Sequence, residues 1–435
     1  MPPAPPTPPR SQAGLHAGSN AGLQAGSDPE PQAATAPDTP RTRGNAWMIQ
    51  RDGSALRYLS DQYRGQLMGY EERERLTLAQ TPPLALAMLS FGDMRSSPRT
   101  LPERFDYHVV NQHLSGAAPD LAARSQAVLT QMHARRDGLA FRTVLAIEAQ
   151  QPGLTLAEAA PDAPLAATLN DQLATGAQAL SRWQKHLHVD RIDLSLLSGA
   201  PDTDEAQADA HYARTALWLG RAVAATTGQA SVPHIVVAQS AGTRDDGTSG
   251  VILAEARLDL DHPTLKFIVA TPGYPYGFLP GMPATHDATS AALMDEIKVL
   301  AVRQTQQGTP WRCPSLSLVH PDGDELRAHF ITDAGLAFDP DEPHGFALHG
   351  CDNGAQITGV RVMRGPPIVR IFCDKAPTGA ALSLSYAWGA TADGQQDRAA
   401  NRGGLRDTWQ ADSLAVPGHV LRRYALSGLQ KVVTG

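Results

Sequence analysis

The chain has 435 residues, 42% of them hydrophobic and 19% charged, which is enough for two or three globular domains. Its net charge of −7, with no run of Lys and Arg among aromatic residues, argues against a nucleic-acid partner. No apolar run approaches the roughly 20 residues that a membrane helix needs, so no membrane span is predicted.

The N-terminus and the cysteines bear on where the protein works. The opening MPPAPPTPPR lacks the basic-then-apolar order of a secretory signal. We therefore expect a cytoplasmic protein, or one released without such a signal, for example by lysis. Cys313, Cys351 and Cys373 share no metal-type or redox spacing, so they are predicted to be free thiols, and no metal or cofactor is expected.

Residues 1–44 form a predicted disordered tail rich in Pro, Ala and Gly. They hold 10 of the 34 prolines and a tandem octad, AGLHAGSN then AGLQAGSD, at 13–28. Such a stretch buries too little apolar surface to offset the entropy of ordering. It is either a disordered extension without a function or a tether that attaches the protein to a larger assembly. Residues 45–80 are a connecting segment of unknown role.

Residues 81–310 alternate short apolar runs with helical patterns. This alternation predicts an α/β domain, a parallel sheet covered by helices on both faces. The glycine at 228 predicts the end of one helix. The expected strands are 84–92, 141–149, 190–199, 232–242 and 265–272, and the expected helices are 165–187, 208–228, 250–263 and 288–304.

Residues 311–435 have a different pattern, in which strands of alternating character are separated by Gly, Pro, Asn and Asp clusters. This pattern predicts an antiparallel, β-sandwich-like domain. The expected strands are 325–332, 356–363, 367–374 and 381–389.

In open parallel sheets, functional groups gather at the carboxyl ends of the strands. The segments expected at those ends are, in order, Gly92-Asp93-Met94, Gly199-Ala200-Pro201-Asp202 with Tyr212 downstream, Gln239, and Pro283-Ala284-Thr285-His286. In this order they resemble the blocks of the SGNH hydrolases, in particular the sialate O-acetylesterase-like branch. The resemblance implies an SGNH-like (flavodoxin-like) sheet and an esterase ancestry.

The C-terminal half extends the resemblance. Carbohydrate-associated and phage-type members of the family often end in a β domain with similar patterns. Those patterns are matched here by Gly345-Phe346, Tyr386-Ala387 and the segment 402–407.

The nucleophile and oxyanion blocks depart from the family. Met94 stands where the family serine should be, and a thioether cannot form an acyl-enzyme. Ser96 is the alternative nucleophile, if the turn that carries the nucleophile is shifted by two residues. Gly153 matches an oxyanion glycine, but Pro152 before it offers no N–H. Asp202 matches the family aspartate, although an Asx turn or helix cap explains it equally well.

The base block departs as well. His286 is placed like the catalytic histidine, but Pro283 stands where the acid should be. A working triad that loses its acid typically loses about 10⁴ in rate, because the imidazole loses control of its tautomer and orientation. Asp287 fits better as the cap of the next helix. His286 is thus either a relict or a base.

Two hypotheses of function follow from this resemblance. The first is a pseudoenzyme that binds carbohydrate at the ancestral active-site cleft. It would be a surface or spike component of a phage-like particle, with cell-surface polysaccharide and other particle proteins as partners. Its candidate ligand-binding residues are Arg244, Asp245, Tyr274, Tyr276 and Phe278. The second is an active carbohydrate O-acetylesterase that uses Ser96 and His286. A purely structural particle protein is a third possibility.

Two further clusters invite a metal interpretation that we do not adopt. HLHVD at 186–190 carries two histidines and is expected to be a solvated loop between a helix and a strand. HPDGDE at 320–325 has too few acidic ligands for calcium and is expected to be a turn.

Overall fold

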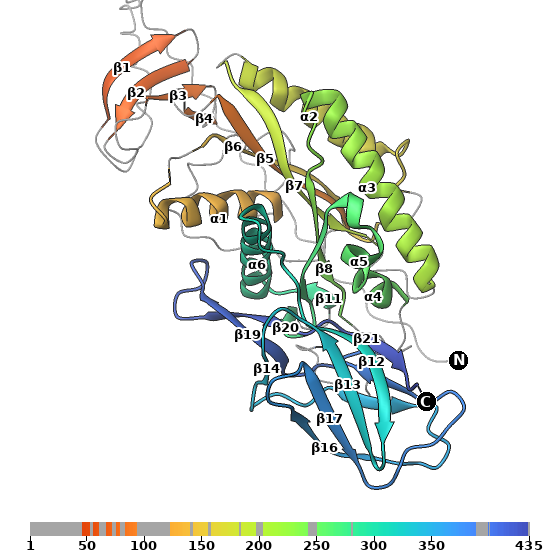
Figure 1. Cartoon of the computed structure of the whole chain (residues 1–435). Coiled ribbons are helices and arrows are strands. Elements are labelled where there is room, and N and C mark those ends of the chain that lie inside the picture. Colours follow the sequence, from red (N-terminus) through yellow and green to blue (C-terminus); the bar gives the residue numbers. More distant parts are fainter. Residues whose placement is uncertain are drawn as a thin grey trace, which may run out of the picture. The chain divides into compact units, whose positions relative to one another are not determined.

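The computed structural model describes residues 46–52, 55–60, 67–71, 75–78, 83–93, 122–139, 142–154, 158–181, 184–196, 203–241, 250–279, 282–388, 399 and 401–433 (Figure 1). For residues 46–78 and 282–284 only the backbone is considered. Residues Gly44–Gly435 form one compact unit. The predicted tail, 1–44, lies outside the described residues.

The segment of unknown role contains a four-stranded antiparallel meander. Its strands are β1 (Ala46–Asp52), β2 (Ala55–Ser60), β3 (Leu67–Glu71) and β4 (Arg75–Leu78), paired in chain order. Consecutive antiparallel strands need only short connections, which explains why so short a segment holds four of them.

The centre of the molecule is a five-stranded parallel sheet of order β6-β5-β7-β8-β9. The strands are β5 (Leu84–Asp93), β6 (Val144–Gln151), β7 (His186–Ser195), β8 (His234–Gln239) and β9 (Phe267–Pro272). The predicted parallel sheet is confirmed, and each predicted strand is present within a few residues of its expected bounds.

Helices cover both faces of this sheet (Figure 1). One face carries α1 (Ala122–Arg136) and α6 (Ala288–Gln306), and the other carries α2 (Pro164–Ser181) and α3 (Glu205–Thr227). The helix predicted over 250–263 is instead α4 (Gly250–Glu255), α5 (Leu258–Asp261) and the 3₁₀ turn Pro263–Leu265.

Two predicted helix ends are confirmed. Gly228 ends α3 with φ +69°, a left-handed conformation that glycine adopts at little cost. Asp287 caps α6, because its carboxylate accepts the N–H of Ser290 at 2.8 Å.

Alternation along β5 divides the core of the parallel sheet into two layers. Leu86 and Met88 belong to the apolar cluster that α1 and α6 complete. Ala87, Leu89 and Phe91 belong to the cluster on the α2 and α3 side. Successive side chains of a strand point to opposite faces, so Ser90 shares the face of Leu86 and Met88.

The C-terminal part is built of three antiparallel sheets, which confirms the predicted antiparallel β region. One has the order β12-β13-β17-β16, the second β14-β19-β20 and the third β15-β18-β21. Their bounds are β12 (Ser315–Asp322), β13 (Glu325–Ile331), β14 (Leu336–Phe338), β15 (Phe346–His349), β16 (Ile357–Val362), β17 (Ile368–Cys373), β18 (Ser383–Tyr386), β19 (Leu405–Asp412), β20 (Val420–Tyr424) and β21 (Gly428–Lys431).

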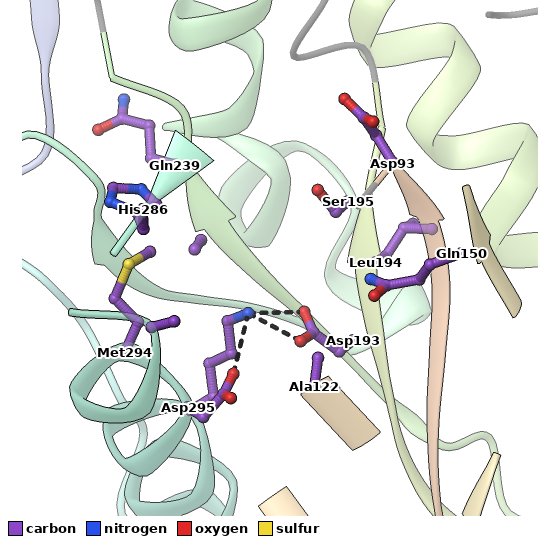
Figure 2. Close-up of a pocket in the computed structure, with 13 residues that line it drawn as sticks. Asp93, Ala122, Gln150, Asp193, Leu194, Ser195, Gln239, His286, Met294 and Asp295 are labelled. Carbon is purple, nitrogen blue, oxygen red and sulfur yellow. Dashed lines mark hydrogen bonds and ion pairs between the residues drawn. The ribbon is translucent and has the colours of Figure 1, made fainter. Parts of the chain in front are cut away.

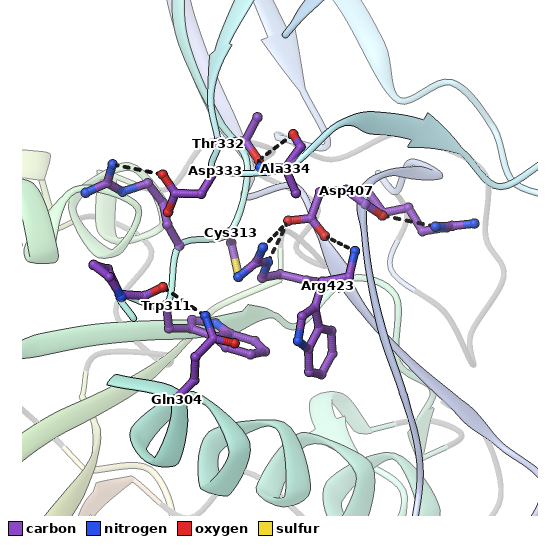
Figure 3. A network of polar contacts seen from close by, with 12 residues as sticks. Gln304, Trp311, Cys313, Thr332, Asp333, Ala334, Asp407 and Arg423 are labelled. Carbon is purple, nitrogen blue, oxygen red and sulfur yellow. Dashed lines mark hydrogen bonds and ion pairs between the residues drawn. The ribbon is translucent and has the colours of Figure 1, made fainter. Parts of the chain in front are cut away.

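A buried polar network lies where the C-terminal strands meet the chain leaving α6 (Figure 3). Arg423 on β20 pairs with Asp407 on β19 at 2.6 Å, and its guanidinium lies 4.9 Å from the centre of the Trp311 ring. Burial raises the pKa of Asp407, and the bond from Arg423 opposes that shift. Trp311 donates to the carbonyl of Ala270 on β9 at 2.9 Å, which ties this network to the parallel sheet.

Glu296 of α6 fixes the loop between β19 and β20. Its carboxylate accepts the hydroxyl of Ser413 at 2.5 Å and the N–H groups of Leu414 and Ala415 at 2.8 and 3.1 Å. Nε2 of His133 on α1 lies 2.9 Å away. Burial acts to raise the pKa of Glu296, but these hydrogen bonds outweigh it and the pKa is lowered.

The three cysteines are free, as predicted. Burial raises the pKa of the Cys313 thiol to about 12, which makes it a poor nucleophile. Among the described residues, no helix combines the length and apolar character needed to cross a membrane.

Candidate functional site

The carboxyl ends of β5, β7 and β8 and the first half of α6 surround a small pocket (Figure 2). It measures about 50 Å³, which suits a few water molecules or one small acyl group rather than a sugar ring. Its lining residues are Asp93, Ala122, Gln150, Asp193, Leu194, Ser195, Ala238, Gln239, His286, Ala291, Met294, Asp295 and Lys298.

His286 is the histidine of this pocket. It ends β11 (Met282–His286), which pairs with β10 (Phe278–Leu279) in a hairpin just before α6. The side chain is largely buried. Phe278 stacks on the imidazole with ring centres 4.5 Å apart, and Tyr276 meets it edge-on at 6.3 Å. The two rings hold the imidazole plane in place.

A backbone carbonyl faces the histidine's Nδ1. The Gly277 oxygen lies 3.3 Å from Nδ1. A carbonyl only accepts, so this contact favours the tautomer with the proton on Nδ1 and the lone pair on Nε2. Gly277 and the two rings therefore favour one tautomer and one orientation of His286 without an acid at position 283, and the role of the histidine as relict or base stays a prediction.

The end of β5 is bent into a conformation reserved for glycine. Gly92 has φ +122°, and a Cβ there would lie 1.9 Å from the Ser195 carbonyl oxygen of the neighbouring strand. The next residue, Asp93, accepts the N–H of Gly153 at 2.8 Å. Gly92 and Gly153 are thus brought to the same edge of the sheet. The Gly153 N–H is already bonded, so in this structure it is not free to bind an oxyanion.

Several predicted residues fall outside the described residues. These are Met94, Ser96, Gly199, Asp202, Arg244 and Asp245. Pro283 lies in β11, but its side chain is not among those described. The roles predicted for these residues stay predictions.

The three aromatic candidates for sugar stacking are buried. Tyr274 is 0% exposed, Phe278 3% and Tyr276 7%. The Tyr274 hydroxyl lies 3.0 Å from that of Tyr386 and donates to the Ala425 carbonyl at 2.8 Å, and burial raises its pKa well above the ordinary value. A ring without an exposed face cannot stack on a ligand. The prediction is therefore corrected for these residues, whose rings pack inside the protein.

Gln239 also has a structural role. Its amide nitrogen donates to the carbonyls of Ile252 and Ser427, both at 2.9 Å, and its oxygen accepts the Ser427 N–H at 2.8 Å. These bonds use its donors and an acceptor site, so Gln239 joins the sheet to the C-terminal strands rather than offering its amide to a ligand.

Tyr212 of α3 holds the ends of β7 and α4 together. Its hydroxyl lies 2.6 Å from the Glu255 carboxylate and 3.0 Å from the Leu196 carbonyl. The same carboxylate accepts the N–H and hydroxyl of Ser240 at 2.6 and 2.9 Å. This group links α3 and α4 to the carboxyl ends of β7 and β8.

A row of polar side chains that are not among the predicted site residues crosses the sheet beneath the pocket. Glu148, Ser90 and Asp193 are direct neighbours in register on β6, β5 and β7. Glu148 accepts the N–H groups of Ala123 and Arg124 at 2.5 and 3.2 Å, so it satisfies the first turn of α1. The sequence signal that could have revealed this row is a polar residue on the same face of each of three mainly apolar strands.

Asp193 is the centre of a buried ion pair (Figure 2). Lys298 of α6 donates to its two oxygens at 2.9 and 2.7 Å, and Gln126 of α1 donates at 2.7 Å. Asp295 lies 3.9 Å from the same ammonium. All of these side chains are buried, so the floor of the pocket is a buried charged cluster linking both helices to the sheet.

Gln150 and Ser195 are the polar lining residues that remain available. Both are half-buried, and neither side chain makes a hydrogen bond with any residue that the structure describes. An amide and a hydroxyl at a pocket mouth suit the hydroxyl and acyl oxygens of a substituted sugar.

The two suspected metal clusters are resolved differently. Residues 186–190 belong to β7, so the expected loop is a strand. Residues 320–325 span the end of β12, the tight turn at Gly323 and Asp324 and the first residue of β13, so the predicted turn is present. Within the described ranges, no group of three or more His, Cys, Asp or Glu is placed to hold a metal ion.

Comparison with known proteins gives distant structural similarities. No family model and no curated protein matches the chain. A carbohydrate acetylesterase from Xanthomonas citri is similar at 14% identity and a TM-score of 0.46, over 82% of this chain and 85% of that one.

Two further solved structures cover about half of this chain. A protein from Arabidopsis thaliana has 11% identity and a TM-score of 0.38, over 51% of this chain and 99% of its own. A carbohydrate acetylesterase from Sinorhizobium meliloti has 12% identity and a TM-score of 0.29, over 52% of this chain and 99% of its own.

Proposed function

We propose that this chain is an SGNH hydrolase-like protein that binds carbohydrate at the carboxyl end of its parallel sheet and has lost the family's serine-dependent ester hydrolysis. The observation that carries the proposal is the pairing of a retained histidine with a lost nucleophile. His286 lines the pocket next to the end of β5, but the residue that follows Asp93 is Met94. A methionine sulfur has no proton to give up and cannot form an acyl-enzyme.

Polar groups at the pocket support the binding part of the proposal. The Gln150 amide offers two donors and an acceptor, and the Ser195 hydroxyl offers one donor and two acceptor positions. A small pocket with such groups at its mouth fits one acyl substituent of a sugar, while the sugar ring lies outside it. The biological setting that we propose, a surface or spike component of a phage-like particle, rests on the family resemblance and the composition of residues 1–44.

An active carbohydrate O-acetylesterase is the second candidate, and one observation favours it. The Gly277 carbonyl at Nδ1 leaves Nε2 of His286 with a lone pair, which is what a general base needs. In this alternative Ser96 is the nucleophile. The two candidates differ in whether ester hydrolysis depends on His286.

Carbohydrate binding is tested with an array of bacterial polysaccharides, each in its O-acetylated and de-O-acetylated form. We expect the full chain to bind at least one acetylated polysaccharide in preference to its deacetylated form. Replacing both Gln150 and Ser195 with alanine should weaken that binding about ten-fold or more, because roughly 1.4 kcal/mol is lost with the hydrogen bonds.

Gln178→Ala is the matched control, since this exposed glutamine lies on α2, away from the pocket. It should bind like the unmodified chain. A chain that binds no polysaccharide, or a Gln150→Ala/Ser195→Ala variant that binds as well as the control, contradicts the proposal.

A further inference from the structure

We propose a second binding site, for a small monocarboxylate with an apolar body, in a cavity between α1 and α6 at the amino end of the parallel sheet. The cavity measures about 360 Å³, which is within the usual range for small-molecule sites. It is lined by the second half of both helices, by residues near the start of β5 and β6, and by Asp190 and Arg191 in the middle of β7.

One side of the cavity is apolar. Leu86, Val144 and Val299 form its wall on the sheet and α6, and Ala134 lies on the α1 side. Leu139 stands at the mouth and is 55% exposed, which is unusual for a leucine. A short alkyl or aryl body would cover these side chains, and each buried methylene would contribute about 0.8 kcal/mol.

The other side holds a buried arginine that is only partly satisfied. Arg191 donates from Nε and Nη2 to the Asp190 carboxylate at 3.2 and 3.0 Å, and from Nη2 to the Thr130 hydroxyl at 3.3 Å. Its Nη1 is buried and has no hydrogen-bond partner among the described residues. A buried donor without an acceptor costs about 1–3 kcal/mol, and an anionic oxygen brought into the cavity would remove that cost.

Two more guanidinium groups stand around the opening. Arg142 is exposed and makes no ion pair with any part of the chain that the structure describes. Arg303 contacts Asp137, and burial together with the nearby Arg136 charge lowers its pKa. Asp190 pairs with Arg191 and Asp137 with Arg303, so Arg142 leaves a positive excess around the cavity that favours an anion. Apolar walls beside this charge favour a carboxylate with a hydrophobic body over a fully hydrated phosphate.

This cavity is separate from the pocket of His286. Both use α1, β7 and α6, but they share no lining residue. The His286 pocket takes Asp193 and Lys298, whereas the cavity takes Arg191 and Arg303. Binding in the cavity should therefore not depend on His286.

The test is calorimetric titration of the full chain with sodium hexanoate, with hexanamide and with inorganic phosphate. Hexanamide keeps the apolar body without the charge, and phosphate keeps a charge without the body. We expect hexanoate to bind with a Kd at least about ten-fold lower than either of the others. No heat of binding with hexanoate up to about 10 mM, or phosphate binding as tight as hexanoate binding, would overturn the proposal.

Variants locate the site. Arg142→Ala should weaken hexanoate binding about ten-fold and leave hexanamide unchanged, since only the charge interaction is lost. Ala134→Phe should fill the cavity and abolish binding of both. Arg221→Ala, an exposed arginine on α3, and His286→Ala should bind like the unmodified chain. Unchanged binding in Ala134→Phe, with the fold verified by circular dichroism, or lost binding in Arg221→Ala would place the ligand elsewhere.

Discussion

Lys298→Met is expected to destabilise the fold by about 3–5 kcal/mol, one of the largest effects of any single substitution near the pocket. The ammonium of Lys298 is buried against both oxygens of Asp193, with Asp295 close by. Methionine has a similar length but no charge, so it leaves buried carboxylates without their cation. The free energy of unfolding, from urea denaturation followed by circular dichroism, measures the loss.

A second substitution separates the ion pair from simple packing. Asp193→Asn in the Lys298→Met background removes one of the uncompensated charges and keeps an acceptor for Gln126. We expect the double variant to recover about half or more of the lost stability. Lys375→Met, at an exposed position just after β17, should change stability by less than about 0.5 kcal/mol. If Lys298→Met costs no more than this control, the buried pair does not stabilise the floor of the pocket.

Gly92→Ala is expected to cost about 3–6 kcal/mol, the sum of backbone strain and overpacking. Gly92 has φ +122°, and the added Cβ would meet the Ser195 carbonyl oxygen at 1.9 Å. Relief requires β5 and β7 to separate at the end that forms the pocket. Thermal and urea unfolding would both report the change.

The matched control for Gly92 is Gly228→Ala. Gly228 also has a positive φ, of +69°, but nothing lies within 4 Å of its added Cβ. That variant should lose only about 1 kcal/mol, the ordinary cost of alanine in a left-handed cap. Equal losses in the two variants would mean that the contact between β5 and β7 is not tight.

The sequence predicted the parallel sheet well because its strands are buried on both faces. LALAMLSFG and LKFIVATP are continuous apolar runs with few alternatives to a central strand. The cap at Asp287 and the stop at Gly228 followed from local rules that need no knowledge of the rest of the chain. The short strands β14, β15, β20 and β21 carry too few residues for such a signal.

The floor of the pocket could not be predicted in the same way. Glu148, Ser90 and Asp193 meet only because three parallel strands pair in a particular register, and a single sequence does not specify that register. Lys298 comes from a helix more than 100 residues further along the chain. The role of Tyr274 and Tyr276 was equally hidden, since an aromatic loop has the same sequence pattern whether it faces a ligand or the core.

The orientation of the His286 imidazole depends on residues that the sequence pattern did not indicate. Because Pro283 stands in place of the acid, the sequence predicted that no acidic side chain would fix the orientation of the His286 imidazole. In the structure, the Gly277 carbonyl and the rings of Phe278 and Tyr276 hold it in one orientation. A positioned imidazole is therefore present, and the proposed loss of hydrolysis rests on the nucleophile position.

The most direct measurement is the hydrolysis of an acetyl ester by the unmodified chain and by His286→Ala, with Ser96→Ala in parallel. Each variant is first verified to be folded. The proposed function predicts that all three hydrolyse the ester at the same background rate. A rate above background in the unmodified chain that falls by about 10³ or more in His286→Ala would contradict it. A matching fall in Ser96→Ala would identify the protein as an active esterase.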